Sequence, residues 1–133
     1  MIDEEMIGSL ESAALTVRLK AHAPYSNFQV GSAILTQCGE MFVGCNVENA
    51  SFSLTICAER VAAGTAIASG KRKWQAIAIA SRGAVTPCGA CRQFLAEFGN
   101  DLLVVCIDSE TGHVTRHMLS DLLPYSFSKD ALA

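Results

Sequence analysis

The spacing of apolar residues along the chain predicts an alternation of helices and short strands. Residues 3 to about 22 carry an apolar residue every three or four positions, with charged residues largely on the other faces, which is typical of an amphipathic helix. Pro24 follows and is expected to end this helix, because proline lacks the amide hydrogen that a further turn requires.

Two β-prone runs come next, at residues 28–36 and 41–43. Cys38-Gly39 lies between them as turn residues, so a hairpin is predicted. The polar stretch 46–51 follows the second run directly. Polar stretches after a strand are usually loops, so this one counts as a candidate site only with further support.

The remainder of the chain alternates helical and strand patterns. Residues 57–68 are rich in alanine and apolar almost all round, which predicts a buried helix with Thr55 as its N-cap and Ser69-Gly70 at its end. The elements predicted after it are a buried strand at 74–80, a helix at 88–98, a strand at 102–107, an edge strand at 114–118 and one helical turn at 120–124.

This order of elements indicates an α/β fold. Strand–helix–strand units place neighbouring strands in parallel with right-handed crossovers, and the hairpin at the start makes the sheet mixed. We therefore expect a three-layer α/β/α arrangement around a mixed five-stranded sheet. A chain of 133 residues fits one domain, covering residues 1–133.

Composition and charge exclude several classes of function. The net charge is −3, and the only basic run, Lys71-Arg72-Lys73, lies at the end of a predicted helix, where cations complement the helix dipole. A nucleic-acid ligand is therefore not expected. No run reaches the ~18 apolar residues of a membrane span. Acidic residues at positions 3–5 do not suit a signal peptide, so we expect a cytoplasmic protein.

Three of the six cysteines lie where the two central helices are predicted to begin. Cys88 and Cys91 are three positions apart, so both sulfurs lie on one face of a first helical turn, and Cys57 comes from the other helix N-terminus. Helix N-termini favour thiolates. Three thiolates suit Zn²⁺ and leave one tetrahedral position for water. Glu59 is placed to move protons on that water without being a ligand.

A closed structural zinc site is the alternative. A fourth ligand is available from three further cysteines and three histidines: Cys38, Cys45, Cys106, His22, His113 and His117. A closed site gives Glu59 no role, so a catalytic site is favoured. A lone cysteine in a strand is usually a small buried hydrophobe.

Two arginines lie next to the cysteine motifs. Three thiolates on a dication leave a local charge of −1, which weakens the metal as a Lewis acid. We hypothesise that Arg60, Arg92 or both donate hydrogen bonds to the cysteine sulfurs and draw charge away from the metal. Ordinary surface arginines are the alternative.

These motifs resemble the small cytidine deaminases of pyrimidine salvage, in particular the homotetrameric class whose zinc is bound by three cysteines. The zinc motifs alone suit many base deaminases, whereas Asn46-Val47-Glu48-Asn49 is more specific. The segments that carry the resemblance are 24–31, 44–51, 54–60, 87–93 and Leu122-Leu123-Pro124 with Phe127.

The resemblance implies a role for each motif residue. One Zn²⁺ per subunit is held by Cys57, Cys88 and Cys91, and Glu59 shuttles protons. Phe28 packs on the pyrimidine, Asn46 and Glu48 bind the ribose 3′-hydroxyl, and the backbone of Ala58 binds the base carbonyl. Gln93 joins Arg60 and Arg92 around the zinc site, and Phe127 reaches into a neighbouring subunit's site. Members commonly have tyrosine and glycine at Phe52 and Ser53, so a hydroxyl near that neighbouring site is missing here.

The implied activity is hydrolytic deamination of cytidine and deoxycytidine to uridine and deoxyuridine with release of ammonia. One alternative is deamination of another cytosine nucleoside, such as a nucleoside antibiotic. Recognition of the ribose by Asn46 and Glu48 disfavours this alternative. A second is a catalytically silent, zinc-stabilised binding module. Nucleotides are disfavoured because Glu48 would repel a phosphate. The sequence leaves open the preference between cytidine and deoxycytidine and any role of Cys38, Cys45 and Cys106.

Overall fold

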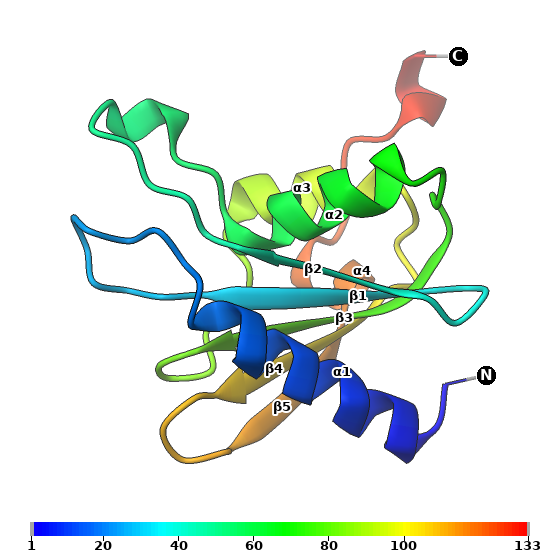
Figure 1. The fold of residues 1–133 in the computed structure, drawn as a ribbon. Coiled ribbons are helices and arrows are strands. Elements are labelled where there is room, and N and C mark those ends of the chain that lie inside the picture. Colours follow the sequence, from blue (N-terminus) through cyan, green and yellow to red (C-terminus); the bar gives the residue numbers. More distant parts are fainter. Residues whose placement is uncertain (1, 133) are drawn as a thin grey trace.

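A computed structural model describes residues 2–132 as one mixed five-stranded sheet with helices on both faces (Figure 1). The strand order is β2-β1-β3-β4-β5; β3 and β4 are parallel, and the other neighbours are antiparallel. The helices are α1 (Glu4–Arg18), α2 (Ala58–Ala68), α3 (Gly89–Ala96) and α4 (Leu119–Leu122), with 3-10 turns η1 (Phe52–Leu54) and η2 (Lys129–Leu132). The strands are β1 (Gly31–Thr36), β2 (Met41–Cys45), β3 (Trp74–Ser81), β4 (Leu103–Asp108) and β5 (Val114–Met118).

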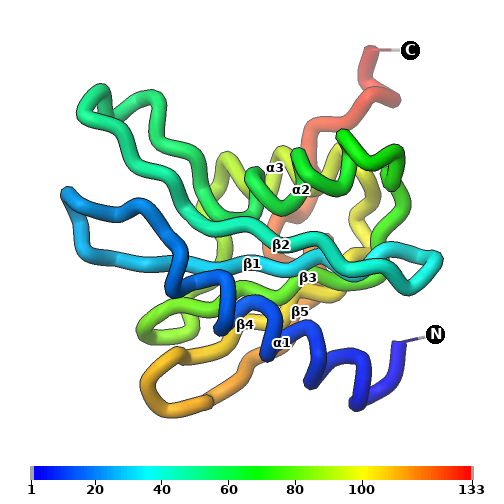
Figure 2. Tube along the Cα trace, viewed as in Figure 1, coloured from blue at the N-terminus to red at the C-terminus, as the bar shows by residue number. Residues whose placement is uncertain are grey.

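The two faces of the sheet form two separate cores, because successive side chains of a strand point to opposite faces. In β1, Ala33 and Leu35 pack with α1, whereas Ile34 packs with the alanines of α2. The Cα trace shows α1 on one side of the sheet and α2 and α3 on the other (Figure 2). This confirms the predicted three-layer α/β/α fold. Within residues 2–132, no helix has both the length and the apolar character needed to cross a bilayer.

The first helix ends earlier than the sequence predicts. It stops at Arg18, well before Pro24, so proline is not what ends it. The chain instead leaves the helix to pair with the stretch after β2. The amide of His22 donates to Asn46 O over 3.0 Å, and the amide of Glu48 donates to His22 O over 2.8 Å. Long-range pairing has therefore replaced the last helical turn.

The start of β1 and the cap of α2 also differ from expectation. The strand predicted from residue 28 begins at Gly31, because the residues before it bond to the side chain of Asn46. Helix α2 has Cys57 as its N-cap, in an extended conformation, whereas Thr55 ends the preceding 3-10 turn. The other predicted elements agree with the structure to within two residues at each end.

Helix α2 lies directly against β2 at Gly44. A Cβ atom at this position would lie 2.8 Å from Ala58 O and closer still to Ala62 N. Both are backbone atoms of α2, so they cannot give way without displacement of the helix. The glycine therefore sets how closely α2, which carries Ala58 and Glu59 at its first turn, approaches the sheet.

Substitution Gly44→Ala is expected to lower the free energy of unfolding by about 1–3 kcal/mol, because the added methyl group overpacks the contact between strand and helix. Chemical denaturation monitored by circular dichroism measures this change. Gly8→Ala in α1 is the matched control, since nothing lies within 4 Å of its added Cβ. The control is expected to gain ~0.5–1 kcal/mol from helix propensity. Equal stability of the two variants would contradict the packing explanation.

Candidate active site

The sulfur atoms of Cys57, Cys88 and Cys91 meet where α2 and α3 begin. All three lie within 4.8 Å of one another, and the Cys57 and Cys88 sulfurs are 3.9 Å apart. Cys57 and Cys88 are the N-cap residues of the two helices, and Cys91 lies buried in the first turn of α3. Both helix dipoles therefore place their positive ends at the sulfurs.

This cluster fits a zinc ion. Tetrahedral Zn–S bonds of about 2.3 Å separate two sulfurs by about 3.8 Å, close to the distance between Cys57 and Cys88. All six cysteines are free thiols, as the proposed metal site requires. Among residues 2–132, no fourth cysteine, histidine or carboxylate joins the group. A tetrahedral ion would therefore keep one position for a non-protein ligand.

The protons on these thiols show why a cation suits the cluster. The pKa of Cys57 is lowered to about 5, first by its hydrogen bond with the Cys91 thiol and also by nearby Arg60, although burial opposes the shift. The same hydrogen bond raises the pKa of Cys91 above its usual range, and burial adds to the rise. One proton is thus retained between two crowded sulfurs. A divalent cation would displace it, as metal binding to thiols generally does.

The two arginines beside the cysteine motifs have different partners. Arg60 Nη2 lies 3.6 Å from Cys57 Sγ, the kind of sulfur contact that was hypothesised. The guanidinium of Arg92 donates to three oxygens, those of the Pro87 and Leu122 carbonyls and the Thr86 hydroxyl, at 2.7–2.9 Å. This corrects the expectation for Arg92. Its hydrogen bonds fasten the loop before α3 to the C-terminal segment.

Gln93 also holds the C-terminal segment. Its Nε2 donates to Phe127 O over 2.8 Å, and none of its hydrogen bonds within residues 2–132 goes to a cysteine sulfur. The side chain of Phe127 is exposed and lies outside the residues that line the cavity described below. Its contact with a neighbouring subunit stays a prediction.

A cavity of about 230 Å³ opens beside the sulfur cluster. It is lined by Phe28, Val30, Asn46, Thr55, Cys57, Ala58, Glu59, Ile79, Val85, Thr86 and Cys88. Glu59 is only 5% exposed, and burial, assisted by the charge of Cys57, raises its pKa to about 7. A carboxyl group with such a pKa exchanges protons readily near neutral pH.

Asn46 builds the wall of this cavity as well as lining it. Its Oδ1 accepts from the amide of Val30 over 2.9 Å, and its Nδ2 donates to Phe28 O over 2.8 Å. The hydroxyl of Ser26 accepts from the amide of Phe28 over 3.0 Å. The backbone of Phe28 is therefore held on both sides, a role of Asn46 that sequence reasoning missed.

Glu48 lies in an adjoining hollow of about 270 Å³, lined by Tyr25, Ser26, Glu48, Phe52 and Thr55. Thr55 lines both hollows. The Glu48 carboxylate accepts from the amides of Tyr25 and Ser26 and from the Ser26 hydroxyl. The hydroxyl contributes most to lowering the pKa of Glu48, so the group stays ionised at neutral pH.

The loop between β3 and α3 forms part of the site that sequence reasoning missed. Val85 and Thr86 line the cavity, and Arg82 lies over the ring of Phe28. Proximity to the Pro87-Cys88 motif was the only signal for Val85 and Thr86. Nothing in the sequence pattern relates Arg82 to Phe28, because the two residues meet only in the tertiary structure.

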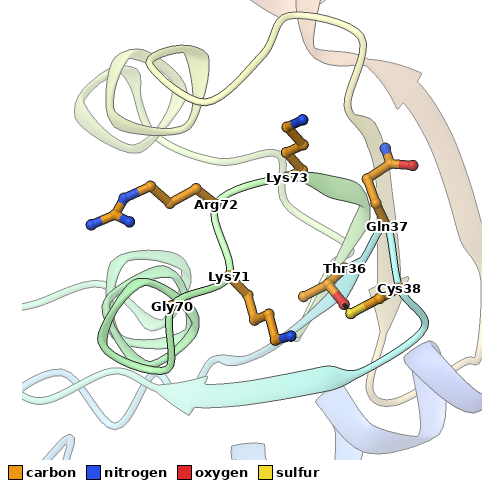
Figure 3. A pocket seen from close by; sticks show the side chains of 7 residues that line it. All are labelled: Thr36, Gln37, Cys38, Gly70, Lys71, Arg72 and Lys73. Atoms are coloured by element: carbon orange, nitrogen blue, oxygen red, sulfur yellow. Dashed lines mark hydrogen bonds between the residues drawn. The ribbon is translucent and has the colours of Figure 1, made fainter.

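A separate hollow of about 320 Å³ lies at the other end of β3, lined by Thr36, Gln37, Cys38, Gly70, Lys71, Arg72 and Lys73. Figure 3 shows the three basic side chains pointing in different directions. Lys71 is paired with Glu40 at 3.1 Å. The side chains of this basic run therefore do not converge on one point.

Comparison with known proteins gives consistent matches. Residues 6–107 match the cytidine and deoxycytidylate deaminase zinc-binding region. A probable cytidine deaminase of Dictyostelium discoideum is 44% identical, over 98% of this chain and 90% of that protein. The cytidine deaminase of Sporosarcina psychrophila is 42% identical over 87% of each chain. The crystal structure of cytidine deaminase from Burkholderia pseudomallei matches with a TM-score of 0.87 and 45% identity, covering 95% of this chain and all of that one. The chain therefore belongs to the cytidine deaminase family.

Proposed function

We propose that this protein catalyses the zinc-dependent hydrolytic deamination of cytidine and deoxycytidine to uridine and deoxyuridine, with release of ammonia. The observation that carries the proposal is a buried Glu59 at the wall of an otherwise largely apolar cavity, beside the cluster of Cys57, Cys88 and Cys91. The names of the family's curated relatives support the same activity.

Each cysteine and Arg60 has a defined part in holding the metal. Cys57, Cys88 and Cys91 would bind one zinc ion per subunit, and bound zinc supplies Lewis-acid activation of the attacking water. Arg60 donates toward Cys57 Sγ and so offsets some of the charge that three thiolates place on the ion.

Glu59 carries the protons of the reaction. Water adds to C4 of the cytosine ring, and Glu59 accepts a proton from it and delivers a proton to the ring nitrogen N3. Glu59 then transfers the remaining proton of the added hydroxyl to the amino group. The C4–N bond breaks, the hydroxyl oxygen becomes the C4 carbonyl, and ammonia leaves. The raised pKa of about 7 suits a carboxyl group that must alternate between base and acid.

The two adjoining hollows suit the two parts of a nucleoside. Phe28 provides an aromatic face for the pyrimidine. The first amides of a helix have no partner within the helix, which supports our assignment of the Ala58 amide, at the start of α2, to the base carbonyl. We assign the ribose 3′-hydroxyl to Asn46 and Glu48, and the latter disfavours nucleotides by repelling phosphate.

We further propose that the chain acts as one catalytic domain within a homotetramer whose subunits complete one another's sites. The loops at residues 23–28 and 46–56 extend past the same end of the sheet (Figure 1). Phe52 and Leu54 in the second loop are 72% and 62% exposed, and the side chain of Phe127 is exposed as well. A neighbouring subunit would cover these apolar side chains. Because the zinc ligands must be reduced thiols, we propose a cytoplasmic location.

Glu59→Gln is expected to lower kcat for cytidine by about 10²- to 10⁴-fold, because the amide cannot exchange the protons of hydrolysis. Its zinc content should remain one ion per chain, since Glu59 is not a ligand. Ammonia release and metal analysis measure the two effects, with Glu97→Gln as the matched control, since Glu97 is the exposed C-cap residue of α3. Zinc without deamination in the wild type would favour the silent binding module instead.

Substrate preference tests the assignment of the ribose contacts. The kcat/KM for cytidine is expected to exceed that for free cytosine by at least roughly a hundredfold, because cytosine leaves Asn46 and Glu48 without their hydroxyl partner. CMP should also be a poor substrate. Glu48→Gln should reduce the ratio of kcat/KM for cytidine to that for CMP, because it removes the repulsion between the Glu48 carboxylate and the phosphate. Comparable rates on cytidine, cytosine and CMP would rule out ribose recognition, and faster deamination of a cytosine nucleoside antibiotic would favour the alternative substrate.

Arg60→Gln is expected to weaken zinc retention or turnover by about 10- to 100-fold, because the Cys57 sulfur loses its hydrogen bond from a cation. Competition with a chromogenic chelator measures zinc affinity directly. Arg116→Gln, which removes a surface ion pair with Glu4, serves as the control. If both zinc affinity and turnover match those of the control, Arg60 does not offset the charge of the thiolates.

A further inference from the structure

Arg82 is the one charged side chain recorded over the ring of Phe28 in residues 2–132. Its guanidinium carbon lies 5.5 Å from the ring centroid, within the distance at which a cation is attracted to an aromatic face. Phe28 lines the same cavity as Glu59 and Cys57. The ring therefore faces the charge of this exposed arginine and also lines the space that would receive the base.

The backbone that carries Arg82 is held in place by Asp108. The amide of Gly83 donates to Asp108 Oδ1 over 3.2 Å, and the amides of Ala84 and Ser109 both donate to Ser81 O. Gly83 and Ala84 have φ values of 89° and 51°, so the chain reverses sharply here. A tight turn at the end of β3 thus fixes the backbone position from which the Arg82 side chain extends.

The guanidinium of Arg82 has no ionic partner among residues 2–132. The two ion pairs within that range join Glu4 to Arg116 and Glu40 to Lys71. Arg82 also donates no side-chain hydrogen bond to another described residue. The contact with the face of the Phe28 ring is therefore the interaction that the structure shows for this cation.

We propose that Arg82 is a positioning residue that holds the Phe28 ring in the orientation needed to pack against the pyrimidine. This inference rests on the proposed function, because it takes Phe28 as the surface for the base. The backbone of Phe28 is already fixed by Asn46 and Ser26, so the ring torsions are its remaining freedom. A ring oriented in advance loses less entropy when the base binds. Substrate affinity, more than the chemical step, depends on this contact.

Arg82→Met tests the proposal, since methionine keeps an unbranched, largely aliphatic side chain and removes the positive charge of the guanidinium. The expected result is a rise in KM for cytidine of about two- to fivefold, with a smaller change in kcat. Arg82→Lys should restore part of the affinity because it keeps a cation near the ring. Arg72→Met is the matched control, because Arg72 is an exposed arginine just before β3, whereas Arg82 follows that strand directly. The control should leave KM unchanged.

A double-mutant cycle with Phe28→Leu separates positioning of the ring from a general effect on the loop. If Arg82 acts through the ring, Arg82→Met should raise KM in the wild type but not in the Phe28→Leu background. An equal effect in both backgrounds, or no rise in KM in the wild type, would overturn this inference alone. Absence of cytidine deamination by the wild-type protein would instead overturn the proposed function, and this inference with it.

Discussion

The convergence of two helix N-termini on three sulfur atoms is the constraint on which the rest of the structure depends. Cys57 and Cys88 are extended N-cap residues, so their side chains lie where the free amides and positive dipole ends of α2 and α3 meet. That arrangement requires both helices on one face of the sheet at a fixed separation. The close approach at Gly44 sets the position of α2 on the sheet, and Glu59 in its first turn lines the cavity together with Cys57 and Cys88.

The polar residues proposed to bind the ribose also hold the loops around the cavity in place. Asn46 and Glu48 bond to the backbone of residues 25–30, and the amide of Glu48 and the carbonyl of Asn46 pair with His22. These bonds hold two long loops together before any substrate arrives. A site assembled in this way loses less conformational entropy on binding. Loss of either side chain is therefore expected to change the shape of the site, besides removing the contacts proposed with the ribose.

The sequence pattern was sufficient for most elements because their apolar spacing reports directly on burial. The mixed sheet, the buried helix α2 and the central strand β3 all follow from such spacing. The prediction was wrong at the end of α1 and at the start of β1. At both points, backbone groups bond to the stretch around Asn46, far along the chain. Local propensity contains no information on such pairing.

The sequence by itself predicted the group of Cys57, Cys88, Cys91 and Glu59, because Cys88 and Cys91 share one helical turn and Cys57 and Glu59 lie together at the start of another. That the two helix starts meet is decided by the tertiary structure. The same reasoning could not decide which acceptors Arg60 and Arg92 would choose. Arg60 reaches a sulfur, whereas Arg92 reaches carbonyl and hydroxyl oxygens. It also gave no sign that Arg82 lies over Phe28. Long side chains select partners from whatever surrounds them in space, and only the packing of helices, sheet and loops determines those surroundings.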